Sequence, residues 1–90
     1  MHIVKDVKYI KGYTLRVTFD NGEERIVDLQ NHLNGEIFQP LKNQNVFKQA
    51  YVNPDIDTVV WDNGADMSPD FLFEVGIVEV IRNYDSRPVV

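Results

Sequence analysis

Apolar and polar residues alternate along the first part of the chain, which is the pattern of strands with one buried face. Residues 3–10 alternate imperfectly and predict a first strand, which Gly12 ends. Apolar side chains then occupy every second position of the next stretch, at Tyr13, Leu15, Val17 and Phe19. Asp20-Asn21-Gly22 follows this second strand as a turn, because glycine takes positive φ without steric cost and asparagine tolerates it. The pattern therefore predicts an antiparallel hairpin.

The register of this hairpin has two alternatives. A two-residue loop would place Val17 opposite Ile26, whereas a three-residue loop with Gly22 in a bulge would place Leu15 opposite Val27. We favour the three-residue loop, because it brings two apolar pairs together on the same face.

The middle of the chain, residues 30–39, has no sustained period and is predicted to be a loop with one short turn. Apolar residues after it are expected to plug an open edge of the core: Phe38, Pro40 and Leu41. Asn43 is predicted to cap a short helix that runs through Ala50.

Residues 56–61 predict a central strand, since the adjacent Val59 and Val60 indicate that both of its faces are covered. Asp62-Asn63-Gly64 is predicted to be a second hairpin turn, and residues 65–67 a short return strand.

Ser68 is predicted to cap a second helix, with Pro69 in the first helical position and Asp70 beside the positive helix end. Gly76 is predicted to end this helix. We therefore expect one domain over residues 1–76 and a tail over residues 77–90, which is either helix or strand. Because the tail holds surplus apolar residues, we predict a homodimer to which it contributes.

The charge of the chain is uneven. The 90 residues have a net charge of −5, and residues 1–52 hold seven basic and six acidic residues. Residues 53–90 hold two basic and eight acidic residues, with no Lys or Arg between Asp55 and Glu74. Nucleic-acid binding needs clustered Lys and Arg, so we expect no nucleic-acid partner. The absence of cysteine excludes disulfides, and no stretch is long and apolar enough for a membrane helix, so a cytoplasmic protein is expected.

Three carboxylates, those of Asp62, Asp66 and Asp70, suggest a metal site, but their spacing does not fit an EF-hand loop, and we expect no metal and no other cofactor. His2 and His32 are isolated and are predicted to be surface or capping residues. Trp61 has two interpretations: a core anchor, or an exposed aromatic residue of a binding face.

An ordered series of segments resembles a family of small bacterial domains of unknown function called DUF2442. It consists of Phe19-Asp20-Asn21-Gly22, Val27-Asp28-Leu29, Leu41, Phe47, Val52 and the run from Trp61 through Asp70. The resemblance implies an α+β fold, in which a small, mostly antiparallel sheet packs against two short helices. It implies no reaction and no catalytic residue. Members are often encoded beside another small protein, which suggests an antitoxin-like role.

The sequence favours a non-enzymatic interaction module that binds a basic protein, encoded nearby, through an acidic face. The predicted binding residues are Trp61, Asp62, Asn63, Asp66 and Asp70. The alternative is a small metal-dependent enzyme that uses the three carboxylates of Asp62, Asp66 and Asp70.

Overall fold

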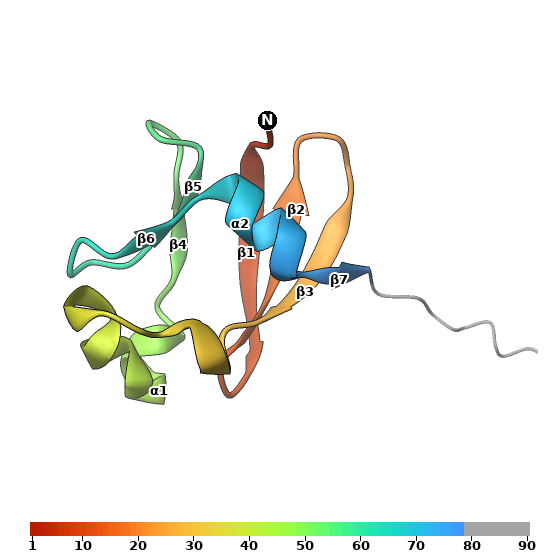
Figure 1. Cartoon of the computed structure of the whole chain (residues 1–90). Coiled ribbons are helices and arrows are strands. Elements are labelled where there is room, and N and C mark those ends of the chain that lie inside the picture. The colour runs from red at the N-terminus through yellow and green to blue at the C-terminus, as the bar shows by residue number, and fades with distance from the viewer. Residues whose placement is uncertain (79–90) are drawn as a thin grey trace, which may run out of the picture.

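Two antiparallel sheets and several short helices make up the fold (Figure 1), and a computed structural model describes residues 1–78. The four-stranded sheet has the order β1-β2-β3-β7, with strands Val4–Lys11, Thr14–Phe19, Glu24–Asp28 and Ile77–Val78. The three-stranded sheet has the order β4-β5-β6, with strands Tyr51–Asn53, Thr58–Val60 and Asp66–Met67. The helices are η1 (Gln30–His32), η2 (Glu36–Lys42), α1 (Gln44–Phe47) and α2 (Pro69–Val75). This arrangement confirms the predicted α+β class.

The β2–β3 hairpin has the favoured register. Leu15 lies opposite Val27, and across the loop the backbone N–H of Phe19 donates to the Glu23 carbonyl at 2.9 Å. Gly22 has a φ of 85°, which a side chain would disfavour. The three-residue loop is therefore confirmed.

A single core lies between the sheets and the helices. Its largest fully buried side chains are Trp61, Phe19, Phe47, Leu15, Leu29, Leu41 and Leu72. The predicted plug is formed by Leu41, which is buried, and Phe38, which is half-buried, whereas Pro40 is exposed. The preceding segment is η1 and η2 rather than a loop with one turn, because short 3₁₀ turns satisfy the backbone of this covering segment.

Both predicted helix caps are present. The Asn43 side chain accepts a hydrogen bond from the Asn45 N–H at 2.9 Å, and the Ser68 hydroxyl accepts one from the Phe71 N–H at 3.1 Å. The α1 helix ends at Phe47 rather than Ala50, because the chain tightens into turns before it enters β4.

Strand β5 is the central strand of its sheet, as predicted, but it begins at Thr58 rather than residue 56. Asp57 has a φ of 59° and belongs to the preceding turn, where its carbonyl accepts the Val4 N–H at 2.9 Å. The side chain of Ile56 is consequently 49% exposed.

Gly76 ends α2 as predicted, but it has an extended backbone with a φ of −74° rather than the left-handed conformation common at helix ends. Glycine is needed here for space. A Cβ atom at this position would lie 2.7 Å from the Arg25 Cβ and 2.9 Å from the Leu72 carbonyl oxygen.

The first two residues of the predicted tail are a strand. Ile77 and Val78 form β7, which pairs with Ile26 and Arg25 of β3. Residues 79–90 lie outside the described residues, so the domain boundary at residue 76 and the tail-mediated homodimer remain predictions. Within residues 1–78, no helix has the length and apolar character needed to cross a membrane.

Candidate functional site

The five predicted binding residues lie along one stretch of chain, from the end of β5 to the first turn of α2. Trp61 is 2% exposed, and its indole N–H donates to the Phe47 carbonyl at 2.8 Å. The core-anchor interpretation of Trp61 is therefore correct. Within the predicted site, the exposed residues are therefore Asp62, Asn63, Asp66 and Asp70, while the Trp61 ring lies in the core.

Asn63 is exposed, but its side chain holds the β5–β6 turn together. Its amide oxygen accepts the Ala65 N–H at 3.1 Å, and its amide nitrogen donates to the Ile37 carbonyl of η2 at 2.9 Å. Next to it, Gly64 has a φ of 92°, as the turn requires. Asn63 therefore fixes the turn against η2 and presents Asp62 beside it.

Asp62 is exposed and faces Tyr51 of β4, whose side chain is 45% exposed. A hydrogen bond to the Asp62 carboxylate raises the pKa of the Tyr51 hydroxyl above its ordinary value of 10.0. Desolvation of the hydroxyl and the negative charge of Asp62 add to this rise in pKa. The two residues thus form a defined pair of an aromatic ring and a carboxylate at the surface.

This pair predicts a titration that can be measured. Asp62→Asn should move the pKa of one tyrosine hydroxyl back toward 10.0, seen as a difference between the absorbance titrations of the variant and the wild type. Only the protonated hydroxyl donates, so the contact stabilises the fold below about pH 10 and is lost as the pH rises through the raised pKa. Tyr51→Phe should lack this alkaline loss of stability. Superimposable titrations of wild type and Asp62→Asn would contradict the pairing.

The remaining two carboxylates have separate surroundings. Asp66 is exposed on β6, opposite Val60 of β5. Asp70, in the first turn of α2, accepts the backbone N–H of His2 at 3.0 Å. Among residues 1–78, no three His, Asp or Glu side chains come together in a way that could hold a metal ion. The geometry therefore gives the metal-dependent alternative no support.

Two adjoining hollows surround Asp70. The larger has a volume of about 640 Å³, with Phe71 and Glu74 of α2 in its wall, and the smaller has a volume of about 300 Å³, with Ile56 in its wall. Met1, His2 and Asp70 line both hollows, so the two lie side by side, and we refer to them together as the groove. Sequence reasoning included Asp70 but missed the groove, because the hollows form where residues 1–3 pack against a segment more than 50 residues away.

The floor of the larger hollow is a stack of three side chains. The His2 ring lies parallel to the Phe73 ring with centroids 3.8 Å apart, and the Arg25 guanidinium lies 3.7 Å from the same centroid. Two groups this close to the ring centroid cannot occupy the same face of the ring, so the Phe73 ring lies between the His2 ring and the Arg25 guanidinium. His2 is therefore a packing residue, and no local sequence signal indicates this role.

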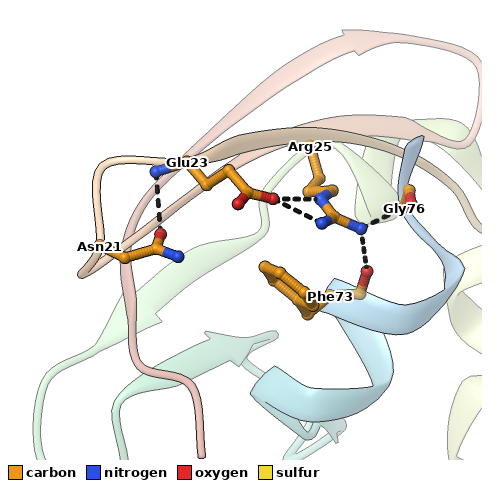
Figure 2. Close-up of polar contacts among 5 residues, drawn as sticks. All are labelled: Asn21, Glu23, Arg25, Phe73 and Gly76. Atoms are coloured by element: carbon orange, nitrogen blue, oxygen red, sulfur yellow. Dashed lines mark hydrogen bonds and ion pairs between the residues drawn. The ribbon is translucent and has the colours of Figure 1, made fainter. Parts of the chain in front are cut away.

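Arg25 joins the β2–β3 hairpin to the end of α2 (Figure 2). Its Nη1 donates to the carbonyl oxygens of Phe73 at 2.8 Å and Gly76 at 3.4 Å, and its Nε donates to the Glu23 carboxylate at 2.8 Å. Lys or Arg side chains commonly satisfy the last carbonyls of a helix in this way. The arrangement fixes α2, and with it Asp70 and Glu74, relative to the larger sheet.

The family described as a protein of unknown function, DUF2442, matches residues 4–77. No curated protein and no solved structure matches the chain significantly.

Proposed function

The chain belongs to the DUF2442 family, whose function is unknown, and we propose that it is a non-enzymatic module that binds a basic protein through an acidic face. The observation that carries this proposal is the exposure of the carboxylates in residues 55–74. The exposed acids of this segment are Asp55, Asp62, Asp66, Asp70 and Glu74. The ion pairs shown within residues 1–78 are made by Glu23 and Glu24, outside this segment. The segment therefore presents negative charge to a partner.

Apolar side chains near the same segment would supply contact area. Tyr51 and Ile37 flank the β5–β6 turn, with exposures of 45% and 46%, and Ile56 is 49% exposed. Interfaces combine a few buried aromatic or aliphatic anchors with a charged rim that steers association. Here the exposed Tyr and Ile side chains would serve as the anchors, and the carboxylates beside them would form the charged rim. The proposed face therefore consists of Asp62, Asn63, Asp66 and Asp70, with Tyr51 in place of the buried Trp61.

Capture of partners from the native host tests this proposal. We expect the tagged wild-type chain to retain a basic protein that the Asp62/Asp66/Asp70→Asn variant fails to retain. The matched control is Asp6→Asn, Asp20→Asn and Glu36→Gln, which removes three exposed charges outside the face. If the wild type and both variants retain equal amounts of the basic protein, the proposed face is contradicted. If both variants lose the basic protein equally, binding depends on the net charge of the chain and not on this face.

An antitoxin-like role in the cytoplasm is the specific form of this proposal. A small acidic chain of net charge −5 can neutralise a basic partner encoded beside it. Co-expression of the chain with the adjacent gene product should then relieve growth inhibition caused by that product alone. Inhibition that persists on co-expression would contradict the antitoxin-like role, while leaving the interaction itself to the capture experiment.

Titration with divalent metals separates this proposal from the metal-dependent enzyme. A metal at 100 times its Kd would raise the free energy of unfolding by about 2.7 kcal/mol. Because the three carboxylates are not gathered, we expect the melting temperature to stay constant when millimolar Mg²⁺, Mn²⁺ or Ca²⁺ is added. A rise that Asp62→Asn or Asp70→Asn abolishes would favour the enzyme instead.

The predicted homodimer is a separate proposal. Strand β7 ends the order of the larger sheet, and its side chains are 65% exposed at Ile77 and 52% exposed at Val78. Sedimentation of the full chain tests it, since a monomer at ~100 µM would rule out an association of useful strength.

A further inference from the structure

We propose that the groove around Asp70 is the part of the acidic face that binds the partner, and that it takes an extended basic segment. This segment would place one aliphatic side chain in the smaller hollow and one Arg or Lys side chain in the larger hollow. The inference rests on the proposed function, which it makes specific in position and in ligand chemistry.

The smaller hollow is suited to an aliphatic side chain. Ile3, Ile56 and Pro69 supply the apolar part of its lining, which also includes Asp57 and Asp70. Ile56 is 49% exposed although its neighbours pack against β1, so a side chain in this hollow would cover apolar surface now in contact with water. A partner residue such as leucine fits this wall.

The larger hollow is suited to a cation. Its lining includes the acidic residues Asp70 and Glu74. Arg25, the single Lys or Arg among the residues that line either hollow, already donates to Glu23 and to the end of α2. Its positive charge is thus opposed by Glu23. Among the other charged groups of the lining, the carboxylates of Asp70 and Glu74 outnumber the positive α-amino group of Met1. Charge complementarity therefore favours a cationic side chain over an anionic one.

The residue His2, at the boundary of the two hollows, is held in place by contacts within the chain. His2 lines both, its ring is stacked on Phe73, and its backbone N–H is bound by Asp70. A fixed wall lowers the conformational cost of binding compared with a loop that must become ordered. One chain segment that crosses His2 can therefore reach both hollows without rearranging the floor.

NMR titration of the full chain with synthetic peptides tests the inference. The probes carry one leucine and one arginine separated by no, one or two glycines, and each has a counterpart with glutamate in place of arginine. At ~20 mM salt, where charges are weakly screened, we expect the amide signals of His2, Asp57, Asp70 and Glu74 to shift with at least one basic probe and with none of the acidic probes.

Two matched variants locate the binding. Asp70→Asn should lower the affinity for the basic probe at least about fivefold, whereas Glu36→Gln, which removes an exposed carboxylate outside both the groove and the proposed face, should leave the affinity unchanged. Dispersed spectra of both variants confirm that they fold. Shifts confined to the β5–β6 turn, equal binding by Asp70→Asn, or no shift at ~10 mM probe would each overturn the inference. If the natural partner is captured but depends on Asp62 and Asp66 alone, the groove assignment fails while the proposed function stands.

Discussion

Trp61→Ala is expected to lower the free energy of unfolding by about 3–5 kcal/mol, the range for removing a large buried aromatic side chain. Trp61 is 2% exposed and lies 5.8 Å, between ring centroids, from Phe47. The substitution also removes the 2.8 Å hydrogen bond from the indole N–H, which leaves the Phe47 carbonyl with the longer bond from the Ala50 N–H at 3.3 Å. Since small domains have a total stability of about 5–15 kcal/mol, this loss is a large part of the whole.

Urea denaturation followed by circular dichroism measures this change. The conservative variant Trp61→Phe keeps an aromatic ring but loses the indole N–H, so we expect it to cost less than the alanine variant. An alanine variant within about 1 kcal/mol of wild type would contradict the placement of the ring in the core.

Arg25→Met is expected to lower the free energy of unfolding by about 2–3 kcal/mol, because several charged hydrogen bonds are lost together. Methionine keeps much of the stem that packs on the Phe73 ring, but it cannot donate to the carbonyl oxygens of Phe73 and Gly76. The Arg25 side chain is 18% exposed, so solvent screens these bonds only in part. Amide hydrogen exchange should accelerate in the last turn of α2 and in β7.

Glu23→Gln is the matched control for Arg25→Met. It removes the charge opposite the guanidinium but leaves the contacts of Arg25 with α2, and Glu23 is 38% exposed, so a smaller loss is expected. Exchange in α2 that is unchanged in Arg25→Met would show that the arginine does not hold the helix in place.

Local features of the fold could be predicted from the sequence because their causes are local. Alternation sets the buried face of β2, and the position of Gly22 with the apolar pairs sets the hairpin register. The caps at Asn43 and Ser68 depend on a side chain and a backbone N–H two or three residues away. Such features need no knowledge of the rest of the chain.

Long-range contacts could not be predicted in this way. The bond between His2 and Asp70 spans 68 residues, and the bond between Arg25 and the Phe73 carbonyl spans 48 residues. Nothing near Arg25 in sequence distinguishes it from an ordinary hairpin arginine. Gly76 shows the same limit: its position as a helix end was predictable, but its close approach to Arg25 was not.

The residues of the proposed acidic face were partly predictable. The absence of Lys and Arg between Asp55 and Glu74 is visible in the sequence, and it led to Asp62, Asp66 and Asp70. The sequence could not show whether Trp61 is buried or exposed, because the residues before it are apolar on both faces of the strand and so do not indicate which way its side chain points. The groove could not be found either, since one of its walls comes from the first residues of the chain.

The most direct test of the acidic face is the affinity of the captured partner, measured by calorimetry against three proteins. These are the wild type, the Asp62/Asp66/Asp70→Asn variant and the control variant at positions 6, 20 and 36. We expect the Kd of the face variant to rise at least about tenfold, equivalent to 1.4 kcal/mol, and that of the control to change little. The wild-type Kd should also rise with salt, because exposed charges are screened. Equal Kd values for the face variant and the wild type would contradict an acidic binding face.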